Sequence, residues 1–138
     1  MTSTINMQDI RYLNLFSKIT KINTRHCFKY NETIFFCVPQ SLLSRAIGPN
    51  GANIKKINEV LKRRIRIIAC PKGIEDIKKF IQSIVNPVEF KELEIKNNVV
   101  ILTAGQQSKA ALLGRNKRRL IEMQGIISDY FGKEFRII

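Results

Sequence analysis

The chain has 138 residues, of which 44% are hydrophobic, and it carries 24 Lys and Arg against 11 Asp and Glu, a formal net charge of +13. This length predicts one domain or two very small ones. The charge attracts polyanions, which leaves nucleic acid, an anionic membrane surface or acidic proteins as partners. No run of about eighteen apolar residues occurs, so nothing is expected to span a bilayer, and membrane is the weakest candidate.

Secretion and metal binding are not expected either. Residues 1–7 are polar and lack the apolar core of a signal peptide, which favours a cytoplasmic protein. The cysteines Cys27, Cys37 and Cys70 lie in apolar runs and fit reduced core thiols. The single histidine, His26, has no Cys-x-x-Cys pair or second histidine to complete a zinc site. No cofactor is therefore expected.

The chain contains the same pattern twice. Residues 44–54 read SRAIGPNGANI, and residues 110–120 read AALLGRNKRRL. Gly48 and Gly114 are offset by 114 − 48 = 66 residues. The same offset aligns the apolar segments 33–38 and 99–104, whereas 64–68 matches 134–138 at an offset of 134 − 64 = 70. We therefore expect two domains, residues 1–70 and 71–138, joined near Pro71-Lys72-Gly73.

The predicted elements of the first copy follow the order α-β-β-α-α-β. Apolar residues recur at helical spacing from Ile10 to Phe16, and two apolar strands follow. A proline-initiated helix leads to the glycine loop, after which an amphipathic helix and a last strand complete the copy. The expected bounds after the first helix are strands His26–Tyr30 and Thr33–Val38, helix Pro39–Ile47, a helix over 54–61 and strand Arg64–Ile68.

The second copy repeats this order, so the fold class is predicted to be α+β. Its helices are expected over 74–84, 105–113 and 120–130, with Gly132 as a C-cap. Its strands are expected at Val88–Ile95, Val99–Ala104 and Glu134–Ile138.

The loop Gly48-Pro49-Asn50-Gly51 has the chemistry of a phosphate site. Gly48 can take the positive φ that ends a helix, and Asn50 tolerates left-handed geometry. Gly51 is expected to open the next helix with the N–H groups of residues 52–54 pointing outward, where they would bind a phosphate oxygen. Lys55 and Lys56 add charge nearby. The alternative is an ordinary turn between two helices, which the four residues alone favour over a phosphate site. The duplicated element order, the apolar Ala46-Ile47 before the loop and the net charge of +13 reverse that preference.

The segment 46–54, AIGPNGANI, together with the duplicated α-β-β-α-α-β order, resembles the type II KH domain. KH domains clamp about four nucleotides of a single strand with a GXXG loop. Two such units in tandem are similar to the KH pair of NusA, and most of all to the short archaeal NusA-like proteins. The resemblance implies two tandem type II KH domains, each a three-stranded sheet with helices packed on one face.

The resemblance also implies a function and partners. These are binding of single-stranded RNA, contact with RNA polymerase, and regulation of transcription elongation, termination or antitermination. It implies neither a membrane nor a small-molecule substrate. A KH protein of ribosome assembly or RNA processing, and a protein–protein adaptor, remain alternatives. No enzyme is expected, because the sequence has no Ser-His-carboxylate order, metal constellation or P-loop.

In the first copy the resemblance places bases between two walls beside the loop. Ala46, Ile47 and Ile54 would form one wall and the strand 64–68 the other, although core packing is an equal alternative for the isoleucines. The candidate RNA-binding residues here are Arg45, Ala46, Ile47, Gly48, Pro49, Asn50, Gly51, Ala52, Asn53, Ile54, Lys55, Lys56 and Arg66.

The second loop departs from the motif because Lys117 occupies the place of the second glycine. A lysine there blocks the closest backbone approach, but its ammonium can meet a phosphate as a point charge. Cations at a helix N-terminus oppose the helix dipole, which suggests that an anion binds there. The alternatives are a solvated basic face or an acidic protein partner. The candidate residues are Gly114, Arg115, Asn116, Lys117, Arg118 and Arg119.

Overall fold

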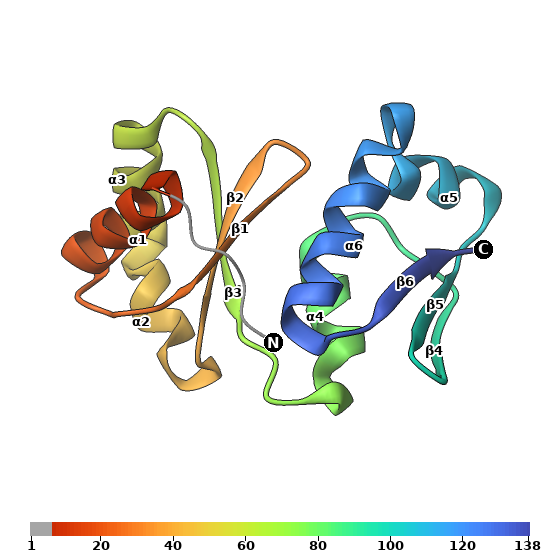
Figure 1. The fold of residues 1–138 in the computed structure, drawn as a ribbon. Coiled ribbons are helices and arrows are strands. Elements are labelled where there is room, and N and C mark those ends of the chain that lie inside the picture. Colours follow the sequence, from red (N-terminus) through yellow and green to blue (C-terminus); the bar gives the residue numbers. More distant parts are fainter. Residues whose placement is uncertain (1–6) are drawn as a thin grey trace. The chain divides into compact units, whose positions relative to one another are not determined.

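The computed structural model of the protein describes residues 7–138, which form two compact units, residues 7–70 and residues 71–138 (Figure 1). The fold class is α+β, as expected. Each unit follows the order α-β-β-α-α-β. Residues 1–6, which carry most of the segment inspected for a secretion signal, lie outside the described residues.

The first unit matches most of the expected bounds. A short 3-10 helix, Gln40–Leu42, precedes α2, and another, Pro49–Gly51, forms the glycine loop. The main elements are α1 (Met7–Thr20), β1 (His26–Tyr30), β2 (Thr33–Val38), α2 (Leu43–Ile47), α3 (Ala52–Leu61) and β3 (Arg64–Ala69).

The second unit repeats this plan. Short 3-10 helices precede its first helix, at Ile74–Asp76, and form its loop, at Arg115–Lys117. The main elements are α4 (Ile77–Val85), β4 (Glu92–Lys96), β5 (Val99–Thr103), α5 (Gln106–Leu113), α6 (Arg118–Phe131) and β6 (Glu134–Ile137).

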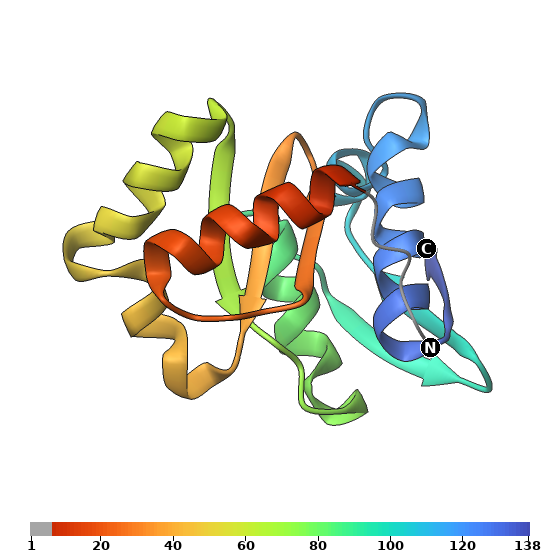
Figure 2. The ribbon, with the colours of Figure 1, turned by 60° about the vertical axis from the view of Figure 1, so that its left-hand side comes forward.

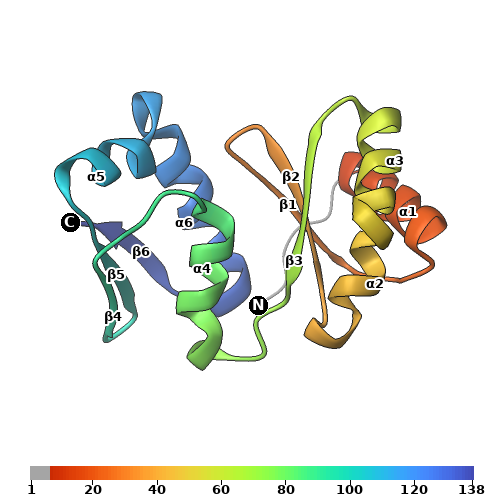
Figure 3. The same ribbon diagram turned by 180° about the vertical axis from the view of Figure 1, so that it is seen from behind.

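Both sheets have the same topology, with the middle strand antiparallel to the strand before it and parallel to the last strand. The strand orders are β1-β2-β3 and β4-β5-β6. In each unit the helices lie on one side of the sheet (Figures 1 and 3). Alternate strand residues point to that side, and in the first unit Ile34, Phe36 and Val38 pack there with Phe16 of α1 and Ile57 of α3.

The two largest differences from the expected bounds are the starts of α2 and β4, which lie 43 − 39 = 4 and 92 − 88 = 4 residues later than expected. The helix expected from Pro39 begins later, because Pro39 has the extended angles φ −55° and ψ 145° and only caps the 3-10 helix that follows. The strand expected from Val88 begins at Glu92, which pairs with Thr103, the last residue of β5. The residues before Glu92 therefore have no further residue of β5 opposite them. The expected C-cap is confirmed, since Gly132 has φ 63° and closes α6.

Candidate nucleic-acid interface

The backbone of the first loop has the positive φ values that its sequence predicts. Gly48 has φ 81° and ψ 165°, a region that essentially only glycine adopts. Asn50 is left-handed, with φ 55° and ψ 28°, and Gly51 follows with φ 72° and ψ 23°. The chain thus turns sharply between α2 and α3 without a regular helix across the turn.

A side chain from α3 holds this turn closed. The Asn53 amide donates hydrogen bonds to the carbonyls of Ala46, at 3.0 Å, and Arg45, at 3.3 Å. These carbonyls belong to the last turn of α2, where intrahelical donors run out. A Cβ on Gly48 would lie 3.1 Å from Asn53 atoms, so Gly48 makes room for this contact. We call the pairing of loop glycine and bonded side chain the clasp; in this unit it is Gly48 with Asn53.

The role of Gly51 differs from that of Gly48. A Cβ on Gly51 would meet no atom of the described residues within 4 Å. The space beside its Cα is therefore open and not filled by protein atoms. The N–H of Gly51 donates to the carbonyl of Gly48 at 3.1 Å, and that of Ala52 to the carbonyl of Pro49. The expectation that the Ala52 N–H points outward is therefore wrong, because the 3-10 turn uses it.

The side chains around the first loop divide into an apolar wall and an exposed rim that carries three positive charges. Ala46 is fully buried, while Ile47 and Ile54 are half-buried and pack against the core cluster. Both isoleucines thus pack against the core and still leave part of their side chains accessible to solvent. The exposed residues of the rim are Arg45, Pro49, Asn50, Lys55 and Lys56.

Arg66 does not join this group. It lies opposite Phe35 in the sheet, and its guanidinium carbon stands 5.3 Å from the centre of that ring. Its neighbours Ile65 and Ile67 point into the core below the helices, so Arg66 points to the other face of the sheet. Burial lowers the pKa of Arg66 from its usual value. The structure therefore separates Arg66 from the loop with which the sequence had grouped it.

The second loop has nearly the same backbone as the first. Gly114 has φ 75° and ψ 174°, Asn116 has φ 56° and ψ 30°, and Lys117 has φ 58° and ψ 25°. Lys117 therefore adopts the left-handed conformation that Gly51 adopts in the first loop. Arg115, Asn116, Lys117 and Arg118 are exposed.

The clasp also recurs, with a different residue. The Arg119 guanidinium donates to the carbonyl of Ala111 at 2.9 Å. A Cβ on Gly114 would lie 2.8 Å from Arg119 Cγ. Asn53 and Arg119 were both expected to contact RNA, but their side chains bond the preceding helix in this structure.

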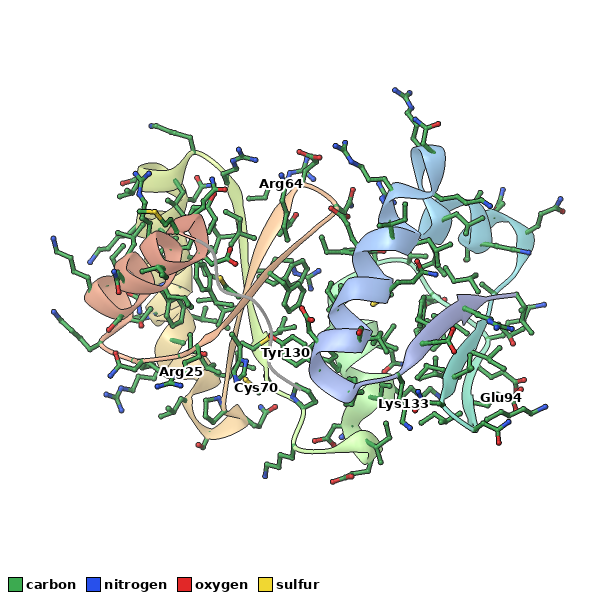
Figure 4. All side chains as sticks on the ribbon, viewed as in Figure 1. Arg25, Arg64, Cys70, Glu94, Tyr130 and Lys133 are labelled. Carbon is green, nitrogen blue, oxygen red and sulfur yellow. The ribbon has the colours of Figure 1, made fainter. Side chains whose placement is uncertain are left out.

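Sequence reasoning overlooked one cationic segment, the turn Lys62-Arg63-Arg64 between α3 and β3. All three residues are exposed. Arg64 stands at the start of β3, and in the second unit Lys133 comes just before the start of β6 (Figure 4). The offset of 70 that aligns the last strands also aligns Lys62 with Gly132, and this signal could have revealed the turn.

The second unit has a hollow of about 560 Å³ at the other end of α6 from its loop. Gln124 and Ser128 of α6 line it, together with residues 132–136. The Gln124 amide donates to the carbonyl of Phe135 at 3.3 Å. Among residues 7–138, no group of three or more His, Cys, Asp or Glu could hold a metal ion. No helix of that range is long and apolar enough to cross a membrane.

Comparison with curated proteins finds archaeal relatives. A protein of Methanococcus vannielii named probable transcription termination protein NusA is 28% identical over 128 residues, covering 88% of this chain and 72% of that protein. The chain is similar to archaeal NusA proteins. Two further proteins of that name are 23% identical: one of Halococcus morrhuae, over 94% of this chain and 97% of that protein, and one of Methanocaldococcus jannaschii, over 84% and 64%.

The similarity to the NusA proteins includes residues of both units, because each match covers more than four fifths of the chain. The resemblance to archaeal NusA-like proteins that was noted from the sequence is therefore confirmed. No protein-family model matches the chain. Among solved structures, the crystal structure of APE1850 superposes with a TM-score of 0.67 at 23% identity, covering 97% of this chain and 99% of that one, which shows a shared fold.

Proposed function

We propose that the protein binds single-stranded RNA through two tandem type II KH domains and acts as a NusA-like factor in transcription elongation and termination. The domains would correspond to the two compact units, residues 7–70 and residues 71–138. The observation that carries the proposal is the first loop: a turn shaped by Gly48 and Asn50, next to which Gly51 leaves open space. A sugar-phosphate backbone needs such space to approach a loop closely.

The charges and apolar surface around this loop support a strand of RNA. Arg45, Lys55 and Lys56 are exposed at the rim and would meet phosphates. The accessible parts of Ile47 and Ile54 would contact the bases. Counterion release then makes the affinity fall with salt, with a slope near −0.7 for each phosphate contact on a single strand. Three contacts predict a slope of about −2 from this loop alone.

The names of the relatives support the transcriptional part of the proposal, with RNA polymerase as the protein partner. No catalytic step is proposed. A role in ribosome assembly or RNA processing would use the same loop, so co-purification with RNA polymerase or with ribosomal particles separates the two. The second loop would add Arg115 and Lys117 as point charges on the same RNA.

The test replaces Pro49 and Asn50 by aspartates and measures binding to single-stranded RNA by fluorescence anisotropy over a salt series. Aspartate tolerates the left-handed geometry of position 50, so the loop should keep its shape. We expect at least about a tenfold loss of affinity, about 1.4 kcal/mol, because two carboxylates would face phosphates.

The control replaces Lys78 and Lys79 of α4 by glutamine, which lowers the net charge by the same two units at exposed positions outside both loops. This variant should lose much less affinity. Equal affinity of a folded Pro49→Asp, Asn50→Asp variant and of this control would overturn the role of the loop.

A further inference from the structure

The long helix of each unit, α3 or α6, has a left-handed residue at both ends. In α3 these are Gly51 at the start and Lys62 at the end, with φ 72° and 56°. In α6 they are Lys117 at the start and Gly132 at the end, with φ 58° and 63°. Each helix thus has one glycine and one lysine in these places, and the two units have them in opposite order.

A lysine in this conformation is uncommon in proteins, although Lys21, just after α1, and Lys117 also adopt it in this chain. Left-handed backbone disfavours residues with a Cβ, and helices most often end in glycine at such a position. Gly132 shows that glycine is compatible with this turn of the fold. Strained residues that persist where glycine would fit point to a role for the side chain. In Lys62 that side chain is an exposed ammonium.

Lys62 is the first of three consecutive exposed cations, since Arg63 and Arg64 follow it. The turn that carries them is fixed by hydrogen bonds from the Lys62 N–H to the Asn58 carbonyl, at 2.7 Å, and from the Asn58 amide to the Arg63 carbonyl. Within residues 7–138 no carboxylate forms an ion pair with any of the three. The turn therefore presents a fixed positive charge with no counterion from the described chain.

This turn and the glycine loop lie at opposite ends of α3 (Figure 2). The ten residues of α3 span about 15 Å. A single strand held at the loop can cover such a distance within the roughly four nucleotides that a KH domain clamps. The corresponding residues of the second unit, Gly132, Lys133 and Glu134, carry no net charge.

We propose that the turn Lys62-Arg63-Arg64 is a second phosphate-binding point of the first unit, which holds the RNA strand at the far end of α3 from the glycine loop. The inference rests on the proposed function, because the same strand must bind at the loop. Cations at a helix C-terminus also favour the helix dipole, but that role acts on stability and leaves RNA affinity unchanged.

The second unit supplies the variant for the test. Replacing Lys62 by glycine and Arg64 by glutamate gives the first unit the uncharged turn of the second, with a glycine that fits φ 56°. The control, Lys78→Gln with Lys79→Glu on α4, lowers the net charge by the same three units at exposed positions. Affinity for single-stranded RNA is measured over a salt series, and thermal unfolding checks the fold.

We expect the turn variant to bind RNA at least about tenfold more weakly than the control. Loss of two phosphate contacts should also reduce the steepness of the salt dependence by about 1.4, without lowering the unfolding temperature. Affinity and slope equal to those of the control overturn the inference, and a protein complex lost in this variant alone would then assign the turn to an acidic partner.

The Pro49→Asp, Asn50→Asp variant distinguishes a failure of the inference about the turn from a failure of the proposed function. If the unaltered protein binds no RNA, both proposals are overturned. If RNA binding depends on Pro49 and Asn50 but not on Lys62 and Arg64, only the inference about the turn is overturned.

Discussion

The first and second loops share glycine at their first position and asparagine at their third, and they differ at the second and fourth. Their backbones nevertheless agree closely, with φ 72° at Gly51 and 58° at Lys117. The shape of the loop therefore depends on the shared glycine, the left-handed asparagine and the clasp. The fourth position leaves that shape unchanged and differs only in whether a Cβ and a positive charge are present there.

The largest change in the free energy of unfolding is expected on replacing the first glycine of either loop. Gly48→Ala should lower the free energy of unfolding by about 1–3 kcal/mol, because the backbone region of Gly48 excludes a Cβ and Asn53 stands 3.1 Å away. Gly114→Ala should cost a similar amount. Denaturant unfolding measures both.

The chain offers a matched control for these substitutions in Gly125, a helical glycine whose added Cβ would meet nothing within 4 Å in the described structure. Gly125→Ala should raise stability by about 0.5–1 kcal/mol. A Gly48→Ala variant as stable as the unaltered protein would contradict the importance of the first position.

The clasp predicts the next effect. Asn53→Ala should cost about 1 kcal/mol of unfolding free energy, because the last carbonyls of α2 lose their donor. Asn53→Arg should recover most of this loss and of the RNA affinity, since Arg119 makes the equivalent bond in the second unit. If arginine at position 53 is as damaging as alanine, the two units do not share the clasp as a common device.

Lys117→Gly tests the fourth position of the second loop. Relief of the left-handed conformation should raise the free energy of unfolding by about 0.5–1 kcal/mol, measured by denaturant titration. The salt dependence of RNA binding should become less steep by about 0.7, because one phosphate contact is lost. A loss of stability would show that Lys117 supports the fold, and an unchanged slope would remove it from the RNA site.

The smallest effect concerns His26, the only histidine of the chain. Burial, and then the charge of Arg25, lower the pKa of His26 below its ordinary value of about 6.5. The unfolded chain then binds more protons than the folded one, so stability falls as the pH drops through about 6.5. Thermal unfolding of the unaltered protein and of His26→Gln between pH 7.5 and about pH 5 should show a smaller pH dependence in the variant.

Much of the fold could be predicted because the chain repeats itself. Two copies of one pattern fix the order of elements better than either copy alone, and strands such as Thr33–Val38 have the predicted bounds. The start of β4 could not be predicted, because it depends on where β5 ends rather than on the residues near Val88.

The positions of the loops could be predicted, but the uses of several side chains could not. Asn53 and Arg119 look like ligand-binding residues in sequence, and only the fold shows that they bond the preceding helix. Arg66 was expected to contact RNA from the strand that would form the second wall of the groove, whereas the alternation along β3 turns it to the other face. The turn at Lys62 could have been predicted, because the repeat aligns Lys62 with Gly132 in the sequence.

The central claim is that the first loop binds RNA by close backbone approach, for which Gly51 must lack a side chain. Gly51→Lys tests it most directly, because this substitution gives the first loop the fourth residue of the second and adds a positive charge to a chain already at +13. Lys117 shows that a lysine can adopt this left-handed backbone at a modest cost in stability, and no described atom blocks a Cβ at Gly51. In anisotropy titrations with single-stranded RNA, we predict weaker binding by the folded variant despite the added charge. Tighter binding, as simple charge attraction would give, would contradict it.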